Sequence, residues 1–203
     1  MPYPVEGDHR GLGASVLIDH VGGVGFASTG PDHFRASLVR VFVIGVDPGL
    51  SRCGYCVLRP GKSRSRAVAL GVMTTPVDAP VARRLALLQR DVRELLDEFP
   101  PTVLAIERVL FQVNVSTAMG VGQASGIVMA EAASRGCDVV EYSPNQVKGA
   151  VAGDGAADKD AVAEMVQRLL GLPTVPKPAD AADAAAVALC HVAHSPALTV
   201  APR

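Results

Sequence analysis

Cysteine, long apolar runs and an excess of either charge are all scarce in this sequence. Its 203 residues contain four cysteines, too few and too scattered for the disulfide framework of a secreted protein. No run approaches the roughly 18 apolar residues of a membrane span, and the N-terminus lacks the basic and apolar regions of a signal peptide. The formal net charge is −1, so no overall positive field indicates a nucleic-acid partner. We therefore expect a soluble cytoplasmic protein that does not associate with membranes.

Two of the cysteines, Cys53 and Cys56, have a spacing that also occurs in metal and redox sites. They lie in a stretch that we interpret as a strand, where side chains alternate between the two faces. The two thiols then point in opposite directions, and no second cysteine or histidine pair is spaced to complete a tetrahedral site. We interpret them as two small residues of a strand.

The chain divides into an extension, one domain and a short tail. Residues 1–40 are rich in glycine and show no sustained hydrophobic period, which predicts a flexible N-terminal extension. Residues 41–195 carry regular patterns and are enough for one well-packed domain. Residues 196–203 follow the last predicted helix as a C-terminal tail.

The patterns within the domain predict an α/β fold with a mixed five-stranded sheet. An apolar run at 41–46 indicates a strand buried on both faces. Turn residues separate it from two further strand-like runs, so the first three strands should form an antiparallel meander. Alternating strands and helices then favour parallel pairing, with helices flanking the sheet. The predicted strands are 41–46, 52–58, 67–75, 102–106 and 137–142, and the predicted helices are 81–99, 116–134 and those beginning near 145, 158 and 180.

Four acidic residues stand at the ends of predicted elements. Asp47 ends the first strand and Glu107 ends the fourth, whereas Asp180 and Asp183 lie in the first turn of the last helix. A spacing of three residues places the last two on one helix face, and a helix N-terminus favours anions. If this helix crosses the strand ends, the carboxylates meet and form the oxygen ligand set that Mg²⁺ prefers. Two such ions about 4 Å apart would stabilise an in-line phosphoryl displacement.

Each acid also has a purely structural interpretation. Asp47 precedes Pro-Gly and suits an ordinary turn. Asp180 suits the N-cap of the last helix, with Asp183 in the capping-box position, and Glu107 could simply be solvated or paired with Arg108. The shared placement of these acids at strand ends and a helix start is what favours the metal site.

The motifs around these acids resemble those of a known family, the RuvC Holliday-junction resolvases. The resemblance runs from position 41 to about position 194 and covers almost everything outside the extension. The first motif, Gly-Val-Asp-Pro-Gly-Leu at 45–50, occurs across the wider RNase H and actin-like superfamily and is only moderately specific. The full series is highly specific: it continues with Ala-Ile-Glu-Arg-Val at 105–109, Gly-Gln at 122–123, Ser-Pro-Asn-Gln-Val-Lys at 143–148, Asp-Lys at 158–159 and Ala-Asp-Ala-Ala-Asp-Ala at 179–184.

This resemblance implies an RNase H-like fold and a homodimer that nicks two strands of a four-way DNA junction symmetrically. Its implied cofactor is Mg²⁺, with two ions per subunit and Mn²⁺ as a substitute, and its implied partner is the RuvAB branch-migration complex. Homologous recombination and repair would be its setting. The catalytic metal-binding acids would be Asp47, Glu107, Asp180 and Asp183. Lys148 and Lys159 match the family's DNA-contacting lysines near the scissile phosphate.

DNA should be held mostly through its phosphates, by basic residues around the acidic pocket. Gln112 and Asn114 follow the catalytic strand and could position DNA. The family often has an aromatic residue three positions after the catalytic glutamate, where it is thought to stack on an unpaired base. Here that position is Leu110, and the next residue, Phe111, is the candidate for stacking. The basic candidates are Arg83, Arg84, Arg108, Lys148 and Lys159.

Small residues repeat at steps of four along the helix predicted at 116–134, namely Ala118, Gly122, Gly126 and Ala130. Such a stripe permits a close backbone approach. The residues themselves favour packing against the chain's own sheet, whereas the resemblance favours a subunit interface. A two-fold dimer suits an approximately symmetric junction, because it presents two equivalent sites to two equivalent strands.

Three other functions share some of these features. A phosphotransferase of the actin-like or sugar-kinase type also opens with an Asp-x-Gly strand turn, but it needs a second lobe for which this chain is too short. A non-catalytic junction-binding module would gain nothing from clustered acids beside phosphate. A related nuclease acting on RNA or flaps would use the same chemistry. Tyr142 and Ser143 lack the base that a nucleophile needs, which predicts direct attack by water without a covalent intermediate.

Overall fold

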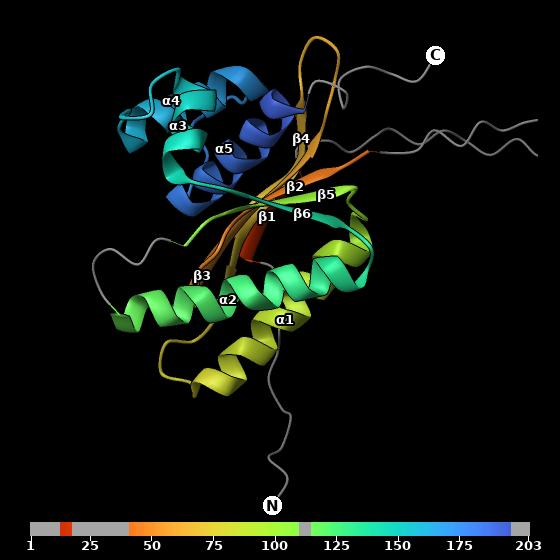
Figure 1. Cartoon of the computed structure of the whole chain (residues 1–203), viewed down its shortest axis with the longest axis vertical. Helices are drawn as coiled ribbons and strands as arrows, with labels where there is room; N and C mark the ends of the chain where they lie inside the picture. Colours follow the sequence, from red (N-terminus) through yellow and green to blue (C-terminus); the bar gives the residue numbers. More distant parts are fainter. Residues whose placement is uncertain (1–12, 18–40, 110–114, 196–203) are drawn as a thin grey trace, which may run out of the picture.

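Figure 1 shows a computed structural model of the chain, which describes residues 13–17, 41–109 and 115–195. One mixed sheet lies between two layers of helices, with the strands in the order β1-β4-β3-β2-β5-β6. The strands are β1 (Gly13–Leu17), β2 (Val43–Asp47), β3 (Arg52–Arg59), β4 (Arg66–Thr74), β5 (Val103–Glu107) and β6 (Asp138–Tyr142). The helices are α1 (Val81–Glu98), α2 (Val115–Ser134), α3 (Pro144–Ala152), α4 (Lys159–Leu170) and α5 (Ala179–His194).

The strand pairing confirms the predicted mixed sheet. Strands β2, β3 and β4 form an antiparallel meander, and β5 and β6 add to β2 in parallel. Parallel neighbours end at the same edge of a sheet. The carboxyl ends of β2 and β5 therefore lie side by side.

A sixth strand, β1, extends the predicted five. It pairs antiparallel with β4, so that Leu17 lies opposite Ala69. An edge strand such as β4 offers unpaired backbone groups to a further segment. Gly13 and Ala14 are of residue types that are depleted in strands, and no strand is predicted here from the sequence. The rest of the predicted extension, 1–12 and 18–40, and the predicted tail, 196–203, lie outside the described residues.

Each face of the sheet has its own hydrophobic core. Helices α3, α4 and α5 cover one face, and α1 and α2 cover the other (Figure 1). Along β2, Val43 packs toward α5, whereas Ile44 packs toward α1 and α2. Cys53 and Cys56 likewise fall in opposite cores, which confirms that they are buried strand residues on different faces.

Helix α5 lies very close to the sheet. A Cβ atom on Gly45 would overlap the backbone of Ala184, and one on Gly54 would overlap the carbonyl of Asp180. The many alanines of α5 leave room for this approach. The first turn of α5 is consequently fixed over the ends of β2 and β3, as the metal-site hypothesis requires.

Within the described residues, no helix is long and apolar enough to cross a membrane.

Candidate active site

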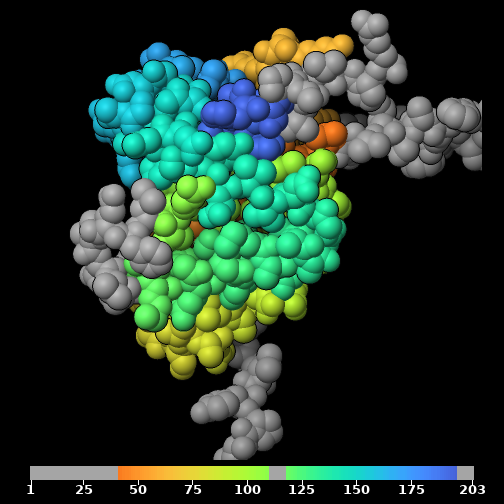
Figure 2. All heavy atoms as spheres, in the orientation of Figure 1, coloured from red at the N-terminus to blue at the C-terminus, as the bar shows by residue number. Residues whose placement is uncertain are grey.

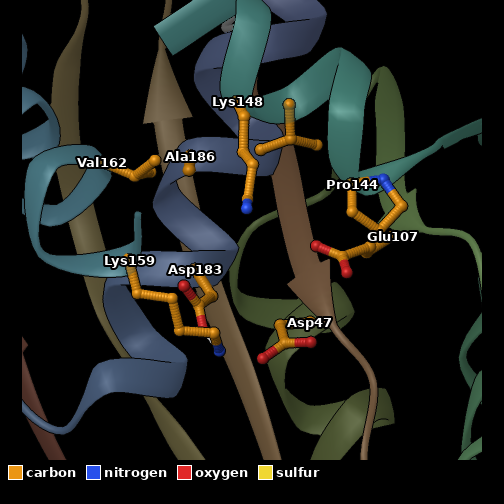
Figure 3. Close-up of a pocket in the computed structure, with 9 residues that line it drawn as sticks. Asp47, Glu107, Pro144, Lys148, Lys159, Val162, Asp183 and Ala186 are labelled. Carbon is orange, nitrogen blue, oxygen red and sulfur yellow. Dashed lines mark hydrogen bonds and ion pairs between the residues drawn. The ribbon is translucent and has the colours of Figure 1, made fainter. Parts of the chain in front are cut away.

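Three of the four predicted acids surround one cavity. Asp47, Glu107 and Asp183 line a hollow of about 110 Å³ together with Lys148 and Lys159 (Figure 3). Its remaining wall consists of Pro144, Val147, Val162 and Ala186. The acids and lysines thus share a small cavity with an apolar back.

Five different elements supply these charged side chains. Asp47 ends β2 and Glu107 ends β5, and the parallel register that pairs Val46 with Ile106 brings the two ends together. Asp183 comes from the first turns of α5. Lys148 lies on α3, and Lys159 is the first residue of α4. The site therefore exists only in the folded chain.

The α3 and α4 lysines owe their positions to well-formed helix starts. Ser143 caps α3 in a capping box with Gln146, and the Asp158 side chain accepts from the Ala161 N–H at the start of α4. Such caps stabilise a helix end by about 1 kcal/mol. They fix the turns from which Lys148 and Lys159 reach the cavity.

Asp180 lies beside the cavity and not in its lining. Helix α5 begins at Ala179 with Pro178 at the N-cap, and no side chain caps it. The structural interpretation of Asp180 as the N-cap is therefore wrong. Its carboxylate instead accepts two hydrogen bonds from Arg52, with Nε at 2.9 Å and Nη2 at 2.7 Å.

Burial and mutual repulsion act on the two strand-end acids. Burial, followed by the charges of Glu107 and Asp183, raises the pKa of Asp47 to about 7. Burial and the charge of Asp183 also raise the pKa of Glu107, although Lys159 and Lys148 oppose this. A nearby positive charge would favour the ionised form of both carboxylates.

The two α5 acids already have cationic partners. Lys159 Nζ lies 2.9 Å from Asp183 Oδ2, and this contact raises the pKa of the lysine. Burial alone would raise the pKa of Asp180, but the hydrogen bonds from Arg52 hold it below its usual value. In this structure Asp180 and Asp183 each have a cationic partner. For Asp47, burial and the neighbouring acids disfavour the ionised form.

The donor set suits a hard divalent cation by its chemistry. As they stand, no three His, Cys, Asp or Glu side chains within the described residues are grouped closely enough to hold a metal ion. Lys159 and Arg52 engage the carboxylates of Asp183 and Asp180. Asp47 and Glu107 nevertheless present oxygen ligands to one cavity, where burial and neighbouring acids raise the pKa of both. Mg²⁺ and similar ions prefer such oxygens.

Comparison with known proteins identifies the family. The family described as crossover junction endodeoxyribonuclease RuvC matches residues 43–191. The chain belongs to the RuvC family. The resemblance noted in the sequence is thereby confirmed.

RuvC relatives match over most of the domain. The crossover junction endodeoxyribonuclease RuvC of Mycobacterium leprae is 51% identical over 156 residues, which cover 76% of this chain and 82% of that protein. The RuvC of Corynebacterium jeikeium is 48% identical over 154 residues, covering 75% and 94%.

Solved structures agree with this assignment. Thermus thermophilus RuvC in complex with a Holliday junction substrate has a TM-score of 0.73 at 36% identity, covering 80% of this chain and 99% of that one. The yeast mitochondrial Holliday junction resolvase Ydc2 has a TM-score of 0.57 at 16% identity and covers 78% and 82%. At that identity Ydc2 shows the fold alone.

In this RuvC family member, the loop after Asp47 is held by residues that the sequence did not single out for this task. The Thr75 hydroxyl donates to the carbonyl of Leu50 at 2.6 Å. Arg84 donates to Ser51 Oγ at 2.6 Å and to Thr75 Oγ1 at 3.0 Å. Arg84, predicted as a DNA contact, therefore has a structural role in fixing the loop between Asp47 and Arg52. Its distance in sequence from that loop concealed this contact.

The structure describes only some of the other residues that are predicted to contact DNA. Arg108 directly follows β5 and is exposed, with its backbone N–H bonded to the carbonyl of Tyr142 at 2.8 Å. Its role with DNA stays a prediction. The positions Leu110, Phe111, Gln112 and Asn114 lie outside the described residues.

The stripe of small residues on α2 faces away from the chain's own sheet. Ala124, Val128 and Ala132 form the buried face of the helix. A Cβ on Gly122 or Gly126 would meet nothing within 4 Å. The interpretation that the stripe packs on the chain's own sheet is therefore wrong. Figure 2 shows α2, in green, across the surface of the molecule with its outer side open.

Proposed function

We propose that this chain is a structure-selective endonuclease that resolves four-way DNA junctions by symmetric, metal-dependent hydrolysis of phosphodiester bonds, in homologous recombination and repair. The observation that carries the proposal is the single cavity that Asp47, Glu107 and Asp183 share with two lysines. The names of the relatives and the junction complex of the Thermus thermophilus protein support the choice of DNA substrate.

The four acids, Asp47, Glu107, Asp180 and Asp183, are proposed to hold Mg²⁺, with two ions per subunit and Mn²⁺ as a substitute. A divalent cation bound there supplies Lewis-acid activation of water and offsets the charge that develops on the phosphate. The protein's part is to hold the oxygens in place. Asp47 and Glu107 sit on buried strands whose register is fixed, and Asp180 and Asp183 sit on a helix seated against glycines.

The lysines are proposed to bind the scissile strand. Figure 3 shows Lys148 and Lys159 extending toward the acids from α3 and α4. Two ammonium groups placed there attract a phosphate and keep it beside the carboxylates. The hydroxyl of Tyr142 lies 2.9 Å from His191 Nδ1, so the expectation that Tyr142 lacks a neighbouring base is wrong. It nevertheless has no role as a nucleophile in this proposal, because it is buried and does not line the cavity. Water is the proposed attacking group.

A homodimer is proposed as the working form, with the outer face of α2 in the interface. The open stripe around Gly122 and Gly126 would allow another copy of the helix to approach closely. Met119, whose side chain is 60% exposed on the same helix, adds apolar surface. We also propose that the dimer works on junction DNA in the cytoplasm, together with the RuvAB branch-migration complex.

The test is cleavage of a synthetic four-way junction by the purified chain, with and without Mg²⁺, beside a linear duplex of the same sequence. Paired nicks at symmetric positions are expected only with the junction and the metal. Asp47→Asn should abolish nicking while junction binding persists, since the carboxylate is not needed for phosphate contact. Asp78→Asn, at an exposed position in the segment between β4 and α1, is the matched control and should cleave normally.

Two outcomes would count against the proposal. Junction binding without nicking by the wild-type chain would favour a binding module. Equal cleavage of linear duplex, or of RNA, would show that the substrate is not the junction.

A further inference from the structure

Arg52 binds Asp180 through two donors on one carboxylate oxygen, as described above. The side chains are 48% exposed for Arg52 and 26% exposed for Asp180. Partly solvated ion pairs of this kind contribute little net free energy and exchange readily for other partners. The pair therefore orients the carboxylate of Asp180 but leaves it able to exchange Arg52 for another partner.

Strand register puts Arg52 at this position. It is the first residue of β3, and Gly54 lies two residues later, opposite Asp47 in β2. Side chains two apart on a strand point to the same face. Arg52 consequently extends over the face where Gly54 touches the start of α5, directly beside Asp180.

Both α5 acids are thus paired with side chains of the protein itself. Lys159 holds Asp183, and Arg52 holds Asp180. A divalent cation that bound Asp180 and Asp183 would have to compete with Arg52 and Lys159 for the carboxylate oxygens. The positive charges of these two side chains would also repel the cation. An arginine fork that fits a carboxylate also fits a phosphate, so the displaced side chain has a natural second partner in DNA.

We propose that Arg52 is a positioning residue that competes with the divalent cation for Asp180 and binds the DNA phosphate once it is displaced. This inference rests on the proposed metal-dependent function. It explains why a basic residue occupies the first position of β3, on the side that carries the acids. Metal binding and phosphate binding then favour each other. A cation on Asp180 frees Arg52 for the phosphate, and a phosphate on Arg52 frees Asp180 for the cation.

The first test measures metal affinity without DNA, by titration calorimetry of the full chain with MnCl₂. Arg52→Gln removes the competing charge and should bind Mn²⁺ about three- to tenfold more tightly than wild type. Arg52→Lys keeps the charge but loses the two-donor fork, and should fall between the two. Arg168→Gln removes another exposed arginine that pairs with an acid, Glu164, and is the matched control that should keep wild-type affinity.

The second test measures junction binding in Ca²⁺, an ion that occupies oxygen sites. Arg52→Gln should bind the four-way junction several-fold more weakly, and its salt dependence should fall by about one ion. A merely structural role would not move metal and DNA affinity in opposite directions. Circular dichroism melting confirms that each variant is folded.

Metal affinity of Arg52→Gln equal to or weaker than wild type would overturn the inference, as would unchanged junction binding. These results leave the proposed function intact. Failure of the wild-type chain to bind Mn²⁺ at all would overturn both, so the two failures are distinguishable.

Discussion

The backbone of Gly54 in β3 lies directly against the carbonyl of Asp180 at the start of α5, with no room for a side chain between them. This contact joins the strand that pairs with Asp47 to the helix that carries Asp180 and Asp183. Any atom inserted there must push the first turn of α5 away from the sheet. The spacing of the acids therefore depends on a residue that carries no functional group.

Gly54→Ala should reduce both stability and activity. The added methyl group meets backbone atoms that cannot rotate away, and overpacking of this kind costs about 1–3 kcal/mol. We expect a lower midpoint in urea unfolding and at least a tenfold loss of junction cleavage. Gly149→Ala, in α3, is the matched control, because the nearest atom to its new methyl group, the Gly155 nitrogen, is 4.0 Å away. That variant should gain roughly 0.5–1 kcal/mol from helix propensity, and equal behaviour of the two would contradict the packing argument.

Asp47→Asn should stabilise the metal-free protein at neutral pH. The folded-state pKa of Asp47 is about 7, against an ordinary value of 3.8. Between those values the folded state holds a proton that the unfolded state has lost, so wild-type stability falls as pH rises through this window. The advantage of Asn should be small near pH 4 and reach about 1–3 kcal/mol at pH 8.

Urea unfolding in EDTA, repeated from pH 4 to pH 8, measures this difference. Asp78→Asn removes an exposed carboxylate that does not line the cavity and should follow the wild type throughout. Parallel stability curves for wild type and Asp47→Asn would contradict the prediction. Added Mg²⁺ should narrow the gap by stabilising the wild type alone.

Lys148→Gln and Lys159→Gln should each weaken junction binding at every sequence tested. A lysine that contacts phosphate contributes about one unit to the slope of log affinity against log salt. The control is Lys62→Gln in the turn between β3 and β4. Since Leu58 pairs with Val43 and Gly54 with Asp47, that turn lies beyond the opposite end of the sheet from the cavity. Fluorescence anisotropy at several salt concentrations measures the slopes, and equal slopes for all three variants would refute the lysine assignment.

The sequence was informative where a pattern maps directly onto geometry. Buried apolar runs located β2 and β5, and the position of Asp47 and Glu107 at their ends followed from strand boundaries alone. The alternation of Cys53 and Cys56 between faces was equally predictable. The family motifs then linked these elements to Asp180 and Asp183.

Contacts between distant segments were not predictable in this way. Nothing in the pattern indicated that Arg52 would bind Asp180, or that Arg84 would bind Ser51. Such pairs depend on side-chain reach after the sheet and helices have packed. The direction of the α2 stripe was also misjudged, because small residues suit a buried face and an interface equally, and Val128 and its neighbours turned out to form the buried side.

Gly126→Leu should separate folding from dimer formation. The position is exposed and an added Cβ atom meets nothing within 4 Å, so the protomer should fold with unchanged or higher melting temperature. In a dimer that packs α2 against α2, the same side chain would hold the helices apart. Sedimentation velocity should therefore show a monomer for this variant and a dimer for the wild type, and paired nicking of the junction should be lost. Leu169, exposed on α4, allows a control in Leu169→Ala, which changes apolar surface elsewhere and should remain dimeric. A dimeric Gly126→Leu variant would show that the interface uses another surface.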